Sequence, residues 1–109
     1  MSDESFEATF RRLRTRYLET SAERLASLDR LLGALGTDGA ESSAIEDMQR
    51  TLHKFAGSGA TYGFARVSEL GLEGELACDA IRKRDGIPSP REIDSLRLVV
   101  DALREALRG

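Results

Sequence analysis

The chain has 109 residues, of which 40% are hydrophobic and 32% are charged, and its net charge is −3 at neutral pH. A chain of this length forms one domain, residues 1–109, with a single core and no room for a second catalytic module. The acidic balance argues against a nucleic-acid partner, because proteins that bind the phosphate backbone are normally basic overall.

The first predicted element is an amphipathic helix over about residues 3–18. Its apolar residues recur at helical intervals: Phe6, Phe10, Leu13 and Tyr17. The other face carries Arg11, Arg12, Arg14 and Arg16. These arginines form either a solvated face or a surface that attracts an acidic partner, since complementary charge raises association rates.

A second helix is predicted from about residue 20 to about residue 35. Thr20 and Glu23 fit a capping box, so a new helix, or a kink in a continuous one, is expected near residue 20. Its apolar face consists of Leu25, Leu28, Leu31, Leu32 and Leu35. The segment 36–39 should end the helix, because Gly36 suits the left-handed position just past a helix.

The third predicted helix contains the only histidine, His53. We expect Ser42 or Ser43 to cap its start, and the helix to run to a point between Gly59 and Tyr62. Its buried stripe is Ile45, Met48, Leu52, Phe55, Ala56 and Gly59. The small residues of this stripe would let a neighbouring helix come close, so Gly59 is interpreted as a packing residue.

A fourth helix is predicted after a turn at Gly63, ending in the basic segment 82–84 that suits a helix C-terminus. Leu72 and Leu76 lie off its apolar stripe. We expect them to pack on the N-terminal helix, with an exposed contact patch as the alternative.

The fifth helix has the clearest start signal in the chain. Ser89 is a favoured N-cap, Pro90 suits the first helical position, and Glu92 completes a capping box. Apolar residues then recur at intervals of three and four to the C-terminus. No segment shows the alternation of a strand, so the predicted fold is all-α: an antiparallel up-and-down four-helix bundle with an additional N-terminal helix.

The position of His53 favours an accessible imidazole. At about 100° per residue, it lies roughly 110° from the centre of the buried stripe. Gly57 lies one turn later, although glycine inside a helix costs about 0.8–1 kcal/mol relative to alanine. One interpretation is that Gly57, Ser58 and Gly59 end the helix and His53 is an ordinary surface residue. A phosphate-binding glycine loop is disfavoured, because such loops follow a strand.

The pattern of His53, Phe55, Gly57, Ser58, Gly59 and Gly63 resembles that of histidine-containing phosphotransfer (HPt) domains of two-component phosphorelays, and it continues with Val67, Leu70 and Glu75. Two positions depart from the family pattern. Ala56 stands where a lysine is frequent, so that nearby cation is missing, and Gly74 stands where a leucine is usual. The resemblance implies a helical bundle in which His53 is the phosphoacceptor, at Nε2. The implied partners are receiver domains and, as a further candidate, a hybrid histidine kinase.

Several residues near His53 are candidates for orienting phosphate or docking a partner: Gln49, Arg50, Lys54, Gly57 and Ser58. Ser58 is the weakest of these, because it points away. The neighbours of His53 on its own helix face include no carboxylate, which indicates a site completed by a partner and not an enzyme acting alone. In the HPt family Mg²⁺ belongs to the receiver, so no metal or cofactor is expected here.

Two other functions remain to be weighed against phosphotransfer. A non-phosphorylated helical adaptor would bind a signalling partner through the His53 face or through Leu72 and Leu76. A dimerising histidine-kinase hairpin is disfavoured, because those hairpins usually place an acidic residue after the histidine, where Lys54 stands here.

The remaining expectations concern the single cysteine, the compartment and the oligomeric state. Cys78 is predicted to be a small core residue. No apolar run approaches the ~20 residues of a membrane span, and the N-terminus lacks a signal-peptide pattern, so a cytoplasmic protein without membrane contact is expected. Because four packed helices can satisfy the amphipathic patterns within one chain, we expect a monomer.

Overall fold

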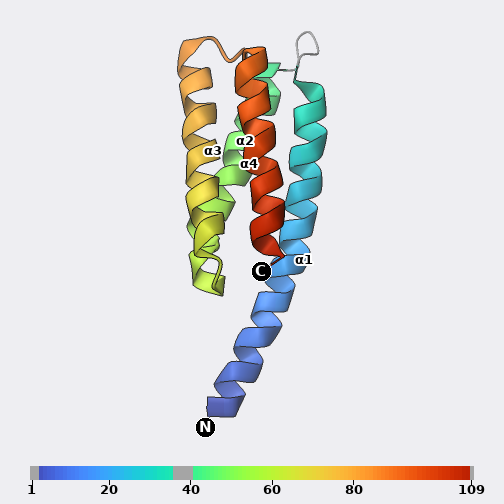
Figure 1. Cartoon of the computed structure of the whole chain (residues 1–109), viewed down its shortest axis with the longest axis vertical. Coiled ribbons are helices and arrows are strands. Elements are labelled where there is room, and N and C mark those ends of the chain that lie inside the picture. The colour runs from blue at the N-terminus through green and yellow to red at the C-terminus, as the bar shows by residue number, and fades with distance from the viewer. Residues whose placement is uncertain (1–2, 36–40, 109) are drawn as a thin grey trace.

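The computed structural model describes residues 3–35 and 41–108, and in these ranges it contains four α-helices, one 3₁₀ turn (η1) and no strand. The elements in chain order are α1 (Asp3–Ala34), α2 (Glu41–Ser58), η1 (Ala60–Tyr62), α3 (Ala65–Arg84) and α4 (Pro90–Leu107). Each helix runs antiparallel to the one before it, and the four close into a ring in which α1 contacts α2 and α4, and α3 contacts the same two helices (Figure 1). The predicted all-α up-and-down bundle is confirmed.

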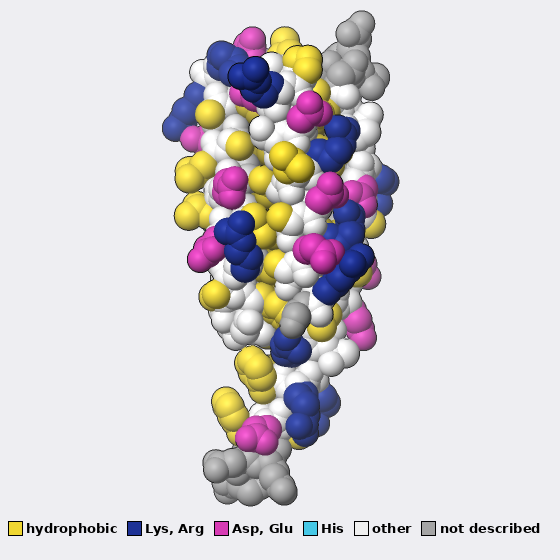
Figure 2. All heavy atoms as spheres, viewed as in Figure 1, with side chains coloured by type: hydrophobic (Ala, Val, Ile, Leu, Met, Phe, Trp, Pro, Cys, Tyr) yellow, Lys and Arg dark blue, Asp and Glu magenta, His cyan; other side chains and the backbone are white. Residues whose placement is uncertain are grey.

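Helix α1 is continuous, so the separate N-terminal helix predicted from the sequence is wrong. Thr20 and Glu23 lie inside α1 and start no helix. A capping box is useful only where backbone amides lack an intrahelical partner, and the helical periodicity continues without a break from Tyr17 to Leu28. The N-terminal part of α1 does not cover the bundle but extends past its end, as Figures 1 and 2 show.

The start of α2 also differs from the prediction. The helix begins at Glu41, so Ser42 and Ser43 lie in its first turn and neither is the N-cap. The predicted loop at residues 36–39 lies outside the described residues. At its other end α2 stops at Ser58, η1 follows, and Gly63 adopts a left-handed conformation with φ of 88°. The predicted turn at Gly63 is therefore confirmed.

The start of α4 forms as predicted. The backbone N–H of Glu92 donates to Ser89 Oγ at 3.1 Å, and the Glu92 carboxylate accepts from the Ser89 N–H at 2.8 Å. Arg84, the last residue of α3, donates to the same carboxylate at 2.8 Å. The capping box thus also ties the end of α3 to the start of α4.

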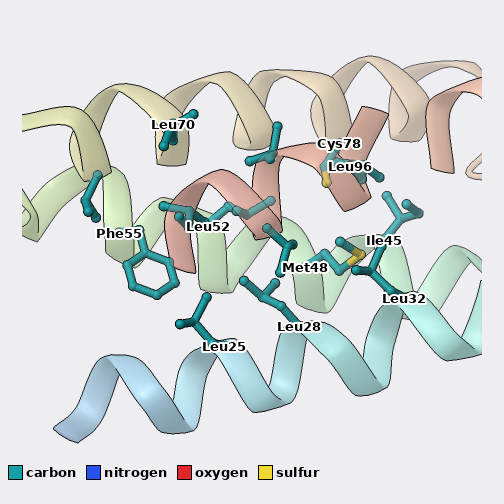
Figure 3. Packing of buried hydrophobic residues seen from close by; sticks show 14 of the residues in the cluster. Leu25, Leu28, Leu32, Ile45, Met48, Leu52, Phe55, Leu70, Cys78 and Leu96 are labelled. Atoms are coloured by element: carbon teal, nitrogen blue, oxygen red, sulfur yellow. The ribbon is translucent and has the colours of Figure 1, made fainter. Parts of the chain in front are cut away.

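The core lies between the four helices and is filled mainly by aliphatic side chains (Figure 3), and its aromatic residues are Tyr17, Phe55 and Phe64. Phe55 and Leu28 are its largest fully buried side chains, contributed by α2 and α1. Cys78 is fully buried, as predicted, and burial raises the pKa of its thiol to about 12.

Helices α2 and α3 pack unusually closely, and glycines allow it. A Cβ atom on Gly71 of α3 would lie 2.5 Å from the backbone nitrogen of Ala56 on α2. A Cβ on Gly59 would lie 2.8 Å from the Phe64 carbonyl oxygen, which confirms Gly59 as a packing residue. This close approach brings polar side chains of α3 to the edge of α2 that carries the histidine.

Candidate functional site

His53 lies on the outer surface of α2, on the side that faces α3. Its side chain is 71% exposed, in agreement with the accessible position predicted from the helical periodicity. The imidazole can therefore be reached by a reactant from solvent.

A carboxylate from α3 orients the imidazole. Glu75 Oε1 lies 2.8 Å from His53 Nδ1, and the Glu75 side chain is 21% exposed. Because an ionised carboxylate only accepts hydrogen bonds, this contact places the ring proton on Nδ1 and leaves the lone pair of a neutral imidazole on Nε2. The sequence interpretation considered only the neighbours of His53 on its own helix face. Glu75 comes from α3, so its contact with the imidazole follows only from the packing of the two helices.

Helix α2 ends at Ser58, inside the segment 57–59 that one interpretation named as its end and one residue before the expected range of Gly59 to Tyr62. Gly57 itself is still helical. It lies within α2, and the only described glycines with positive φ are Gly63 and Gly86. A Cβ added at Gly57 would meet nothing within 4 Å. The surface one turn after His53 is therefore open, and packing does not require glycine there.

Gln49, one turn before His53, connects α2 to the last part of α3. Its Oε1 accepts a hydrogen bond from Arg82 at 2.8 Å, and its Nε2 lies 3.4 Å from Asp79 Oδ1. A hydrogen bond from Lys83 lowers the pKa of Asp79. The sequence did not indicate Arg82 as a candidate residue. Its contact with Gln49 depends on the alignment of α2 with α3, which helical periodicity does not give.

The other candidate residues lie on the side of α2 away from α3. Arg50 is paired with Asp47 at 3.0 Å and with Glu46 at 3.7 Å. Lys54 is exposed and lines a shallow groove between α2 and α1. These two cations therefore lie at the edge of the surface that α2 and α3 form around His53. Neither of them contacts the imidazole.

Ser58 faces α1, where it meets Tyr17, whereas the sequence predicted only that it points away from the phosphate site. Its hydroxyl donates to the Lys54 carbonyl oxygen at 2.6 Å and lies 2.9 Å from the Tyr17 hydroxyl. Since both contacts lead away from α3, Ser58 does not share a surface with the imidazole.

Leu72 and Leu76 are exposed, with 49% and 58% of their surface accessible. The prediction that they pack on the N-terminal helix is wrong, because α1 contacts α2, α4 and η1 and makes no contact with α3. The two leucines are one turn apart on α3, and Glu75 lies directly before Leu76 in the sequence. They form an exposed apolar patch on α3.

Within residues 3–35 and 41–108, no group of three or more histidine, cysteine, aspartate or glutamate side chains is arranged to hold a metal ion. None of the helices in the same ranges is long and apolar enough to cross a membrane.

The comparison with protein families agrees with this geometry. A family model described as the Hpt domain matches residues 12–106, which is most of the chain, so the protein belongs to the Hpt domain family. Membership implies a part in a two-component phosphorelay, with receiver or kinase partners, as a phosphotransfer intermediate and not as a classical enzyme. No curated protein and no solved structure matches the chain significantly.

Proposed function

We propose that this protein is a phosphorelay intermediate that accepts a phosphoryl group on His53 from the aspartyl phosphate of one receiver domain and passes it to another. The observation that carries the proposal is the exposed imidazole whose Nδ1 is 2.8 Å from the Glu75 carboxylate. A neutral imidazole held in this way directs the nitrogen that has a free lone pair to solvent.

In the proposed transfer, every bond that forms is matched by one that breaks, and this domain supplies no metal or cofactor. The lone pair of Nε2 attacks phosphorus, a P–N bond forms, and the P–O bond to the donor aspartate breaks with its electrons left on the carboxylate. The proton stays on Nδ1, and Glu75 stabilises the positive charge that develops on the ring. Transfer to a second receiver is the reverse sequence with a new carboxylate.

The receiver would dock on the surface formed by α2 and α3 around His53. Gly57 leaves open space one turn after the imidazole, and Leu72 and Leu76 offer exposed apolar area on α3. In-line attack tolerates little displacement of the reacting atoms, so a docking surface without a bulky side chain at position 57 is an advantage.

We assign the neutralisation of the phosphoryl group to Arg82, acting beside Gln49. Ala56 provides no cation where the family frequently has lysine, and Arg50 is already paired with two carboxylates. Arg82 donates to the amide oxygen of Gln49, one turn from His53, and the nearby Asp79 carboxylate is paired with Lys83. Lys54 and Arg50 then contribute to the charge of the docking surface, and Ser58 to the contact with α1.

All of these residues come from one chain, so the unit that we propose for transfer is a single copy. We expect it to act in the cytoplasm, as the sequence predicts.

The proposal is tested by replacing His53 with Gln and incubating both proteins with a phosphorylated receiver. The parent should acquire acid-labile, base-stable phosphate and the variant none, while their helical circular dichroism and melting agree, because an exposed residue contributes little to packing. Labelling that persists in His53→Gln would refute the assignment. A parent that binds receivers but never acquires phosphate would favour the non-phosphorylated adaptor.

A further inference from the structure

The N-terminal part of α1 carries an apolar stripe that lies largely uncovered by the other described residues, 3–35 and 41–108. Helix α1 has 32 residues and so rises by about 48 Å, and its first turns extend beyond the other helices (Figure 1). Phe6 is 72% exposed and Leu13 is 45% exposed, with Phe10 half-buried between them. The stripe reaches the bundle only at Tyr17, which is 6% exposed.

The base of this extension is held firmly and its outer part is not. Tyr17 stacks on Tyr62 with ring centroids 4.5 Å apart, and the Arg14 guanidinium lies 4.5 Å from the centre of the Phe64 ring. No residue N-terminal to Arg14 is among these contacts. A helical segment as short as the one before Arg14 is only marginally stable in water by itself. An exposed stripe with two aromatic rings is typical of a surface that a partner covers.

The charges of the extension suit a second copy of the same helix in the opposite direction. The sequence begins the helix with Asp3, Glu4 and Glu7 and continues with Arg11, Arg12, Arg14 and Arg16. Figure 2 shows hydrophobic side chains along one edge of the extension, basic side chains along the other, and an acidic one near its end. An antiparallel pair places the acidic part of each helix beside the basic part of the other, whereas a parallel pair places like charges together.

We propose that the extension of α1 is a self-association surface, on which two copies of this chain pair antiparallel through Phe6, Phe10 and Leu13. With Phe10 level with Phe10 of the second copy, Phe6 of one helix lies within one residue, about 1.5 Å along the axis, of Leu13 of the other, and Glu7 lies equally close to the level of Arg14. The contact is isologous, because each copy offers the same surface. The prediction of a monomer assumed that one chain covers all its apolar stripes, which is wrong for this one.

The pairing surface is small, so we expect the dimer to have a low affinity. Three apolar side chains per copy fall short of the roughly 1,200 Å² at which stable interfaces begin. The dimer should therefore be reversible and concentration-dependent. It leaves α2 and α3 uncovered, so each copy keeps its own His53 surface.

Sedimentation equilibrium of the full chain over a wide concentration range tests the pairing. The apparent mass should rise from one chain towards two, and Phe10→Glu should weaken association at least about tenfold. Leu98→Glu is the matched control, because Leu98 is 68% exposed on α4, and it should leave association unchanged. A parent that stays monomeric, or equal effects of both variants, would overturn the proposal. A monomer that binds vesicles of phosphatidylserine and phosphatidylcholine would assign the stripe to a lipid surface instead.

Cysteine pairing tests the direction of the two helices. Thr9→Cys places two thiols about 3 Å apart along the axis of an antiparallel pair, whereas Ser5→Cys places them about 15 Å apart. Both positions are exposed, and the natural Cys78 is buried and does not compete. We expect Thr9→Cys to form a disulfide-linked dimer on oxidation and Ser5→Cys not to. Cross-linking of Ser5→Cys that equals or exceeds that of Thr9→Cys would reject the antiparallel pair.

Discussion

Nδ1 of His53 on α2 and Oε1 of Glu75 on α3 lie 2.8 Å apart, although 22 residues separate them in the chain. The contact exists because Gly71, one turn before Glu75, allows α3 to approach the backbone of α2 at Ala56. A packing feature of the core therefore determines which ring nitrogen of the histidine is exposed with a lone pair.

Replacement of Glu75 with Ala should slow phosphotransfer at least about tenfold, because a hydrogen bond to a charged group contributes about 1.5–3 kcal/mol and about 1.4 kcal/mol is a factor of ten in rate. Without the carboxylate, the ring proton redistributes between Nδ1 and Nε2, and the fraction of imidazole with a free Nε2 lone pair falls. Nitrogen-15 NMR of the His53 ring measures this tautomer ratio directly, and receiver labelling measures the rate.

Glu73→Ala is the control for this change, because Glu73 is exposed on the same helix and makes no contact with His53. It should leave both the tautomer ratio and the rate unchanged. If Glu75→Ala retains the parent's tautomer ratio, the carboxylate does not orient the ring.

Replacement of Arg82 with Gln should raise the pKa of the phosphoryl group on His53, by about a few tenths of a unit, because a nearby cation favours the dianion. The protein can be phosphorylated with phosphoramidate, so no receiver is needed, and phosphorus-31 NMR follows the titration. Arg50→Gln removes the same charge from a side chain that Glu46 and Asp47 already hold. Equal shifts in the two variants would show that Arg82 has no special relationship to the phosphoryl group.

The helices could be predicted from the sequence because their signals are local. The capping box at Ser89 and Glu92 lies within four residues, and the turn at Gly63 needs only the freedom of glycine. The same local signal failed at Thr20, where the neighbouring turns on both sides continue one helix and leave no free amide to cap. A capping pattern predicts a helix start only when the apolar periodicity also breaks.

The histidine surface could be predicted only in part, for a related reason. The exposure of His53 and the openness at Gly57 follow from positions on one helix. The roles of Glu75 and Arg82 depend on how α2 and α3 align, and that alignment is set by close contacts of Gly71 and Gly59 with backbone atoms. Periodicity identifies which face of each helix is buried, but it does not give the register between two helices.

Replacement of Glu92 with Gln should lower the free energy of unfolding by about 1 kcal/mol at pH 7, in the range of a lost capping interaction. The hydrogen bond from Arg84, followed by the one from the Ser89 backbone, lowers the pKa of Glu92 from 4.5 to about 2. Because the folded-state pKa is depressed, the stabilisation is complete above the unfolded-state value near 4.5 and is lost as the pH falls towards 2. The difference between parent and variant should therefore shrink across this window in denaturant titrations.

Glu69→Gln is the matched comparison, since Glu69 pairs only with Arg66 one turn away in an exposed part of α3. Such pairs contribute little, so this variant should follow the parent at every pH. A Glu92→Gln difference that stays constant down to pH 2 would mean that the carboxylate charge does not carry the effect.

Gly57 should tolerate alanine and reject a long side chain, for two separate reasons. Gly57→Ala is expected to stabilise the domain by up to about 1 kcal/mol, because the residue is helical and a Cβ there meets nothing within 4 Å. Gly57→Gln should keep the fold but slow exchange with a receiver severely, because its side chain occupies the space in front of the imidazole. Thermal melting and receiver labelling measure the two effects independently.

Gly33 on α1 provides a control for both substitutions, because a Cβ at this helical glycine also meets nothing within 4 Å and α1 lies away from the surface shared by α2 and α3. Gly33→Ala should stabilise in the same direction, and Gly33→Gln should leave transfer at the parent rate. If Gly57→Gln also exchanges phosphate at the parent rate, clearance is not the reason for glycine at this position. If the two glutamine variants slow transfer equally, the loss comes from the fold and not from the docking surface, because only position 57 lies one turn from the histidine.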